Sequence, residues 1–242
     1  MTVLLVEGLD VRYGLLQAVC DVSFKIDEGE KLALVGGNGA GKTTLMRALA
    51  GAHRPAGGRI VFEGTDMTGT SAHDRVRAGI TLVPEGRRLF PELTLEENLL
   101  VAGTHARVGP WNMETVLEAF PILMPLRKKR AASLSGGEQQ ATAIGRALMT
   151  NPKLLLLDEV SLGLAPVAVD GVYRSLQTVI EGGATVVLVE QDLVRAMSVA
   201  TRIACMLEGR LVLEGTADSL TRQQITEAYF GLHRDQASGA AT

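Results

Sequence analysis

The chain has 242 residues, of which 46% are hydrophobic and 21% charged, and its formal net charge at pH 7 is −3. A chain of this length can bury a large core, either in one α/β domain or in two smaller lobes. The charge gives no broad basic field for duplex DNA or an anionic membrane, and no segment approaches the roughly eighteen consecutive apolar residues of a membrane span, so neither nucleic-acid binding nor a bilayer crossing is expected.

The first thirty residues predict an antiparallel edge sheet. Segments 2–13 and 17–26 alternate apolar and polar side chains with period two, and the second ends at the turn cluster "DEGE". Because the N-terminus has a short apolar patch and no basic leader, it is expected to be a strand rather than a signal peptide. Cys20 and Cys205 lie in apolar, strand-like segments and are expected to be free buried thiols, as in a reducing cytoplasm, rather than a disulfide or a metal site.

Further along the chain, short apolar runs alternate with helical patterns. This alternation is typical of a parallel sheet flanked by helices and predicts an α/β fold. The runs expected to be buried strands are residues 31–36, 80–85, 153–159 and 184–191. Hairpin-like strands are also expected at residues 59–68 and 204–216, so the sheet should be mixed rather than purely parallel.

Between Leu89 and Met149 the strand signals vanish and helical patterns take over. A capping box formed by Thr94 with Glu97 predicts the start of one helix. Asn112 begins another segment whose apolar residues fall on one helical face. This part of the chain is therefore interpreted as an α-helical subdomain inserted into the sheet lobe.

These patterns define one domain, residues 1–235, with an insertion. The expected parts are a sheet lobe at about 1–85 and 152–235, a helical subdomain at about 86–151, and a disordered tail at 236–242. The basic block 127–130 is interpreted as a solvated helix end or loop, with a docking patch as the alternative.

A glycine-rich loop follows the first buried strand and opens a helix. It satisfies G-x-x-x-x-G-K-[ST] in Gly36, Gly41, Lys42 and Thr43. The glycines let backbone N–H groups turn toward phosphate oxygens, and the helix N-terminus adds the positive end of its dipole. Lys42 can reach the β and γ phosphates and act in catalysis, while the Thr43 hydroxyl can ligate Mg²⁺. The residues expected to hold ATP are Gly36, Gly37, Asn38, Gly39, Ala40, Gly41, Lys42, Thr43 and Thr44.

Two acids end the strand "LLLLDE", residues 154–159, where open α/β sheets place their ligands. Asp158 is predicted to hold Mg²⁺, and Glu159 to polarise the attacking water as general base. For this segment considered alone, the alternative is an acidic helix N-cap after a strand. The phosphate loop elsewhere in the chain favours the metal and base roles.

The stretch "LSGGEQQ", residues 134–140, is small and polar, and by itself it can neither coordinate a metal nor supply a nucleophile. Ser135 can donate its hydroxyl, and Gly136 and Gly137 let backbone N–H groups approach an anion at a helix start. The stretch is therefore predicted to be a second phosphate-binding segment. The alternative is an ordinary capped helix start, with Ser135 as N-cap and Glu138 three residues later.

The phosphate loop, "LSGGEQQ" and "LLLLDE", in that order and with a helical segment between the first two, resemble the nucleotide-binding subunit of an ABC transporter. The resemblance covers nearly the whole chain. It implies a P-loop NTPase fold of the ABC type, with a mixed central sheet, an antiparallel edge sheet and an inserted helical subdomain. It also implies a head-to-tail dimer in which the signature residues of one subunit, Ser135, Gly136, Gly137 and Glu138, face ATP on the phosphate loop of the other.

Other positions match the family's pattern one at a time. Tyr13 corresponds to the aromatic residue that stacks on adenine, with packing at a strand end as the alternative. Residues 161–166, "SLGLAP", lie where the family has the loop that crosses the dimer seam. Glu85 stands where most members have a glutamine, and it can serve Mg²⁺ or water. Gln191 stands where most have a histidine, and it can donate a hydrogen bond to the γ phosphate but cannot exchange a proton near neutral pH.

The stretches "VPEGRRLFPELTLEENL", "SLGLAP" and "LVEQD" together resemble the second ATP-binding subunit, the LivF type, of branched-chain amino acid importers. Relatives with this pattern are also assigned to urea or short amides. Gly37 and Val160 depart even from this closer pattern, because prolines are expected there, and ATP affinity or turnover could differ as a result.

The resemblance implies an ATPase that powers an ABC importer from the cytoplasmic side, bound to the inner face of the plasma membrane through two transmembrane permease subunits. A second ATP-binding subunit is expected as partner, in a heterodimer or alternatively a homodimer, and a solute-binding protein acts indirectly. The alternative function is an ATP-binding regulatory subunit with little hydrolysis, motivated by Gln191 and Gly37. Soluble ABC proteins of DNA repair or translation are not expected, since the chain has neither a long coiled coil nor two ATPase halves.

Overall fold

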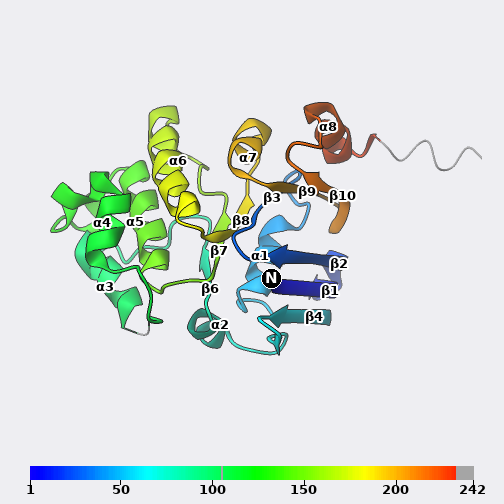
Figure 1. Ribbon diagram of the computed structural model, residues 1–242, viewed down its shortest axis with the longest axis horizontal. Coiled ribbons are helices and arrows are strands. Elements are labelled where there is room, and N and C mark those ends of the chain that lie inside the picture. The colour runs from blue at the N-terminus through cyan, green and yellow to red at the C-terminus, as the bar shows by residue number, and fades with distance from the viewer. Residues whose placement is uncertain (105, 233–242) are drawn as a thin grey trace, which may run out of the picture. The chain divides into compact units, whose positions relative to one another are not determined.

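The computed structural model describes residues 1–104 and 106–232 (Figure 1). The chain divides into two compact units. The first comprises Met1–Thr70 and the described part of the chain from Val187 onward, and the second comprises Ser71–Val186. The tail 236–242, which the sequence predicts to be disordered, lies outside the described residues. The limits of the predicted helical subdomain stay a prediction.

A four-stranded antiparallel sheet forms the N-terminal part of the first unit, so the edge-sheet prediction is confirmed. Its strands, in spatial order, are β2 (Leu16–Asp27), β1 (Thr2–Tyr13), β4 (Gly57–Phe62) and β5 (Thr65–Asp66). Leu4, Val6 and Leu9 of β1 are fully buried. Their burial explains the period-two pattern, because one face of the sheet packs against the core.

The first unit also contains the strands that support the glycine-rich loop. β3 (Lys31–Val35) pairs in parallel with β9 (Arg202–Leu207), and β9 pairs in antiparallel with β10 (Arg210–Thr216). This confirms the predicted hairpin at the C-terminal side and the mixed character of the sheet. The boundary between the units falls within β8 (Thr185–Val189).

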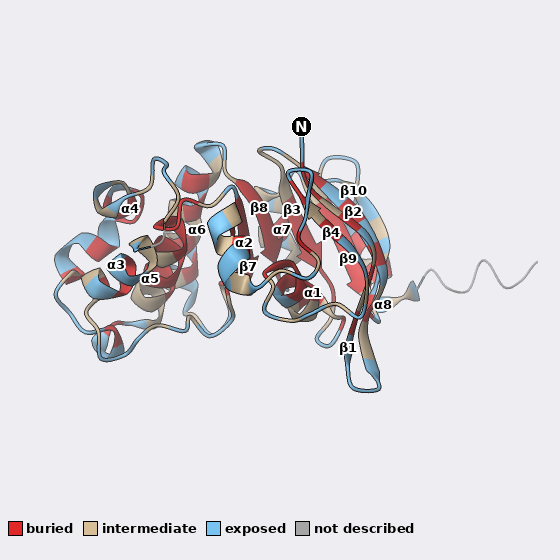
Figure 2. Cartoon of the chain, turned by 90° about the horizontal axis from the view of Figure 1, so that it is seen from below, coloured by how far each residue is buried: buried red, intermediate tan, exposed pale blue. Residues whose placement is uncertain are grey.

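Three helices of the first unit complete its core: α1 (Lys42–Leu49), α7 (Leu193–Val199) and α8 (Arg222–Phe230). Figure 2 shows that β3 and β9 are buried along most of their length. Val35, Cys205 and Ile225 lie in one apolar cluster of buried residues. Burial raises the pKa of the Cys205 thiol to about 11, so this thiol stays protonated at neutral pH. Both cysteines are free, as predicted, but only Cys205 is buried, since Cys20 is partly exposed in β2.

The second unit combines two parallel strands with helices. β6 (Ile80–Val83) and β7 (Leu154–Asp158) pair in parallel. Its helices are α2 (Ala72–Ala78), α3 (Leu95–Gly103), α4 (Met113–Ala119), α5 (Gly136–Leu148) and α6 (Pro166–Glu181), with short 3₁₀-helices at Pro121–Leu126 and Ala131–Ser133. The predicted helical content of the segment between β6 and β7 is therefore confirmed in the described residues.

The predicted helix starts are also confirmed. Thr94 caps α3 in a capping box with Glu97, because the Thr94 hydroxyl accepts from the Glu97 N–H at 3.2 Å and the Glu97 carboxylate accepts from the Thr94 N–H at 2.8 Å. Asn112 caps α4 in the same way. Such caps satisfy backbone donors that the first helical turn leaves without a partner.

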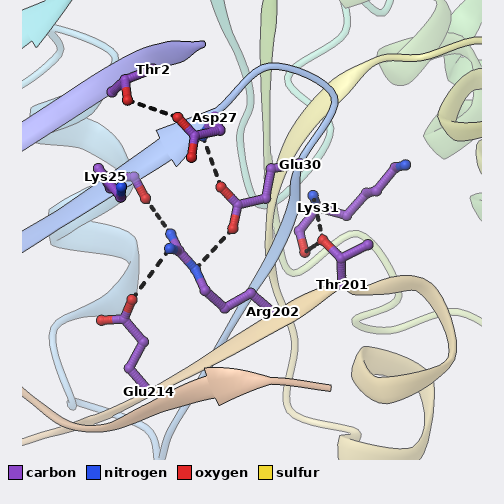
Figure 3. A network of polar contacts seen from close by, with 8 residues as sticks. All are labelled: Thr2, Lys25, Asp27, Glu30, Lys31, Thr201, Arg202 and Glu214. Carbon is purple, nitrogen blue, oxygen red and sulfur yellow. Dashed lines mark hydrogen bonds and ion pairs between the residues drawn. The ribbon is translucent and has the colours of Figure 1, made fainter. Parts of the chain in front are cut away.

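A polar network around Arg202 joins the edge sheet of the first unit to its β9–β10 hairpin (Figure 3). The Arg202 guanidinium lies 3.0 Å from a Glu30 carboxylate oxygen and 3.4 Å from one of Glu214, and it donates to the Lys25 carbonyl. Glu30 also accepts a hydrogen bond from the Asp27 N–H at 2.8 Å. The Arg202 and Glu30 side chains are only 15% and 16% exposed, so solvent screens this pair less than a surface ion pair.

Replacing Arg202 with methionine should lower the free energy of unfolding by about 1–3 kcal/mol, because it leaves the half-buried Glu30 carboxylate without its cation. Methionine keeps much of the apolar stem, so the loss would report the guanidinium. The urea midpoint of each purified variant measures the effect. Arg210→Met, at an exposed position of β10, is the control, and equal midpoints for the two variants would contradict the prediction.

Candidate nucleotide-binding site

The glycine-rich loop of the first unit has a backbone that other residues could not adopt at two of its positions. Gly36 and Gly41 have φ angles of 152° and 101°. A Cβ at Gly36 would lie 2.2 Å from the Met206 carbonyl oxygen, and one at Gly41 would lie 2.3 Å from the Ala18 carbonyl oxygen. Glycine is therefore required at both positions, by backbone conformation and by close approach.

Gly209, in the turn between β9 and β10, connects this loop to the edge sheet. Its N–H donates to the Ala40 carbonyl at 3.0 Å, and its carbonyl accepts from the Cys20 N–H at 2.8 Å. A Cβ at Gly209 would lie 2.9 Å from the Ala18 oxygen. The phosphate loop, β2 and the β9–β10 turn are thus held together by backbone contacts.

Lys42 begins α1 directly after the loop and is only 4% exposed. Its Nζ donates to the carbonyls of Gly36 at 2.7 Å and Gly37 at 3.0 Å, so the ammonium lies against the inner side of the loop. The N-cap of α1 is Gly41, which has no side chain to occupy the first backbone N–H groups. A buried cation and a helix N-terminus without a side-chain cap fit a phosphate chain.

Three other predicted site positions belong to the first unit. Tyr13 ends β1 and is 42% exposed, and its ring centroid lies 4.4 Å from that of His53. Gln191 follows β8 at an exposed position. A Cβ at Gly37 would meet only the Tyr229 ring, at 4.0 Å, so nothing in the structure explains the glycine at this position.

The predicted acid pair lies in the second unit. Asp158 ends β7 and is 1% exposed, and the whole strand is buried. Glu159 follows with a left-handed backbone, φ 49°, and its carbonyl accepts from the Leu162 N–H at 3.2 Å. Such a conformation costs a non-glycine residue about 1–3 kcal/mol and persists where the surroundings impose it. Val160 is 1% exposed, so packing in the core explains an apolar residue there.

The start of α5 contains the signature residues. Ser135 is the N-cap: its hydroxyl accepts from the Glu138 N–H at 3.4 Å, and the Glu138 carboxylate accepts from the Ser135 N–H at 2.7 Å. A Cβ at Gly136 would lie 3.1 Å from Leu164, and one at Gly137 would lie 2.8 Å from Ala168. The capped helix start is therefore present, and the two glycines also have a packing role that sequence reasoning missed.

The loop after β6 contains Glu85, which is exposed. A residue that sequence reasoning missed fixes the far end of this loop. Asn98 of α3 is fully buried, and its side-chain amide donates to the carbonyls of Phe90, Leu93 and Thr94 at 3.0, 3.3 and 2.9 Å. Its carbonyl oxygen accepts from the Phe90 N–H at 2.9 Å.

Two negative findings concern the described residues alone. Across residues 1–104 and 106–232, no three His, Cys, Asp or Glu side chains gather into a group that could hold a metal ion. No helix in the same part of the chain is long and apolar enough to cross a membrane.

Comparisons with known proteins agree with this geometry. The model of the ABC transporter family matches residues 19–161. The chain is 43% identical, over 93% of its length and 98% of the relative's, to the high-affinity branched-chain amino acid transport ATP-binding protein BraG of Pseudomonas aeruginosa. It is 32% identical, over 89% of its length and 93% of the relative's, to a probable branched-chain amino acid transport ATP-binding protein LivF of Archaeoglobus fulgidus.

Solved structures show the same fold. The chain resembles the crystal structure of a nucleotide-free ATP-binding cassette from an ABC transporter, with a TM-score of 0.81 and 26% identity over 94% of this chain and 95% of that one. It also resembles the ADP conformation of the cassette MJ1267, with a TM-score of 0.77 and 27% identity over 95% of both chains.

Proposed function

The chain belongs to the ABC transporter family, and we propose that the solute whose import it powers is a branched-chain amino acid. Membership makes it an ATP-binding subunit whose hydrolysis of ATP is coupled to transport. The observation that supports this solute assignment is the 43% identity to BraG over 93% of the chain. The alternative of a regulatory subunit with little hydrolysis is not favoured.

The proposed roles in the first unit concern the nucleotide. Lys42, already buried against the loop carbonyls, would move its ammonium donors to the β and γ phosphates of ATP. The backbone N–H groups of residues 36–44 would bind the phosphate oxygens. Tyr13 would stack on adenine with its exposed ring, and Gln191 would donate its amide to the γ phosphate.

The proposed roles in the second unit concern hydrolysis. Glu159, held in a left-handed turn, would accept a proton from the attacking water. Bound Mg²⁺ would neutralise phosphate charge, and its proposed ligands are Asp158 and Glu85, directly or through water, and the Thr43 hydroxyl. Carboxylate and hydroxyl oxygens are the donors that this hard cation prefers, so the residues fit the metal.

The proposed partner subunits are inferred from membership of the ABC transporter family. Ser135, Gly136, Gly137 and Glu138 of one subunit would cover the ATP of a second ATP-binding subunit, since the N-terminus of α5 favours an anion. The working dimer, preferably with a different ATP-binding subunit, would act on two permease subunits at the inner face of the plasma membrane. A solute-binding protein would deliver the amino acid from the other side.

The solute assignment is tested by uptake. In a strain whose own copy of this chain is deleted, uptake of labelled leucine should fall to background, and the wild-type chain should restore it. The Glu159→Gln variant, produced at the same level, should not. Uptake of labelled urea, the alternative solute, is measured in the same strains as the matched comparison. Loss of urea uptake with unchanged leucine uptake would overturn the proposed solute while leaving the ATPase role intact.

A further inference from the structure

The loop after β6 makes a left-handed turn in the second unit. Gly86, Arg87 and Arg88 have φ angles of 77°, 64° and 49°, and the Arg88 N–H donates to the Gly86 carbonyl at 2.6 Å. The left-handed region is unfavourable for residues with a Cβ, and two such residues in succession require contacts that hold them there. Those contacts show which part of the structure the loop depends on.

The side chain of Arg87 supplies these contacts, and it makes them with α5. Its Nη1 donates to the Gln139 side-chain carbonyl at 2.9 Å, and a Cβ at Gly136 would lie 3.2 Å from its Nη2. Gln139 in turn donates to the Ala131 carbonyl at 3.0 Å. The guanidinium of Arg87 therefore lies beside the first turn of the signature helix, 52 residues away along the chain.

A second contact on the same helix holds the backbone of Arg87. The Arg146 guanidinium donates to the Arg87 carbonyl at 3.2 Å and lies 5.8 Å from the centre of the Phe90 ring. Burial lowers the pKa of Arg146 from its ordinary value. With Phe90 fixed by Asn98 of α3, the loop is held at its middle by α5 and at its end by α3.

We propose that Arg87 is a positioning residue. It fixes the loop that contains Glu85 to the start of α5, so that this loop and the signature residues keep the same position relative to each other when ATP is bound between subunits. This proposal rests on the proposed function, because it requires the signature to cover a partner's ATP. It assigns to Arg87 no contact with the nucleotide.

The charge of Arg87 supports this role. A cation beside a helix N-terminus opposes the positive end of the helix dipole, so the position is unfavourable by itself. It becomes favourable when an anion approaches the same turn. The Glu138 carboxylate in the first turn of α5 offsets part of this cost, while it also accepts from the Ser135 N–H at 2.7 Å. A phosphate from a partner's ATP would satisfy the arrangement.

The test separates subunit association from nucleotide binding. In the hydrolysis-deficient Glu159→Gln chain mixed with its partner subunit, light scattering gives the ATP concentration for half-maximal dimerisation. Arg87→Met should raise that concentration by at least about fivefold, the lower range of measured coupling between sites. The affinity of the isolated chain for a fluorescent ATP analogue should change by less than about twofold, as for a change distant from the site.

Two further variants keep the inference specific. Arg88→Met is the matched control, because Arg88 has the same charge and backbone region but its guanidinium has no hydrogen-bond partner in residues 1–104 and 106–232. Arg87→Met combined with Gln139→Ala should be no worse than the more affected single variant, because both remove one link. Additive effects would contradict a shared link.

The outcomes are distinguishable. If the Glu159→Gln parent does not dimerise on ATP, the dimer of the proposed function fails, and the positioning role fails with it. If the parent dimerises and Arg87→Met behaves like Arg88→Met, only the present inference is overturned. A loss of ATP-analogue binding by the isolated Arg87→Met chain would also overturn it, since the residue would then act on the nucleotide site itself.

Discussion

Replacing Glu159 with glutamine is expected to reduce ATP turnover by about 10²-fold to 10⁴-fold, the contribution typical of a positioned general base. Glutamine keeps the size of the side chain and its hydrogen-bonding ability but cannot accept the proton of the attacking water. ATP should still bind, because the residues proposed to bind its phosphates, 36–44, are unchanged in this variant. Phosphate release at saturating ATP, measured with the partner subunit present, checks the first expectation.

The same variant should accumulate a dimer when ATP is added, because ATP that is not hydrolysed keeps both subunits closed on it. Size-exclusion chromatography with and without ATP measures this. The control is Glu181→Gln, at an exposed position at the end of α6, which should turn over ATP like the wild type. Wild-type turnover by a monomeric Glu159→Gln chain would contradict both the base and the dimer.

Replacing Lys42 with alanine is expected to weaken ATP binding by about 100-fold or more, since the variant lacks at least two charge-assisted hydrogen bonds of roughly 1.5–3 kcal/mol each. The side chain is 4% exposed, so water does not replace the ammonium easily. Isothermal titration of the purified chain with ATP in the presence of Mg²⁺ measures the affinity. Phosphate release should fall in parallel.

Loss of the fold must be separated from loss of the charge in this experiment. The Gly36 and Gly37 carbonyls lose their donor in Lys42→Ala, so the thermal midpoint of the variant without nucleotide has to be recorded as well. Lys25→Ala, at an exposed position of β2, is the matched control and should bind ATP normally. An unchanged affinity and rate in folded Lys42→Ala would show that the loop is not the nucleotide site.

The features that sequence reasoning predicted correctly are those whose causes are local. The β1–β2 hairpin follows from period-two alternation, the cap at Thr94 from Glu97 three positions later, and the helix after Asn112 from apolar residues on one helical face. The glycine-rich loop follows from the spacing of Gly36, Gly41, Lys42 and Thr43. Each of these signals lies within a few residues of the structure that it predicts.

The features that were missed depend on residues far apart in the chain. Arg87 meets Gln139 across 52 positions, and Arg202 donates to Lys25 across 177. No short-range pattern contains such a pair. Asn98 is the exception, because a polar residue between Leu95 and Leu99 on a buried helical face is a sign of a structural hydrogen-bond role, and that sign was available in the sequence.

The glycine-rich loop has structural requirements that do not depend on a bound nucleotide. The geometry of Gly36, Gly41 and Lys42 has physical reasons in backbone conformation, close approach and burial. The proposed role of Glu159 as general base is tested by the Glu159→Gln variant. At the signature, packing restricts Gly137 most, because a Cβ there would lie 2.8 Å from the Ala168 Cβ, whereas a Cβ at Gly136 would lie 3.1 Å from the Leu164 side chain.

The turn at Gly209 has a practical consequence for work with this subunit. An exposed hairpin tip is ordinarily where a fluorophore, an epitope or a purification tag can be inserted with little damage. Here the tip is hydrogen-bonded to Ala40 and Cys20, so an insertion would displace the backbone of the glycine-rich loop. A reporter group is better attached at the exposed Leu15, in the β1–β2 turn. Where adenine binding is to be measured, the exposed end of α6 is the better position, because Leu15 lies close to Tyr13, the proposed adenine contact.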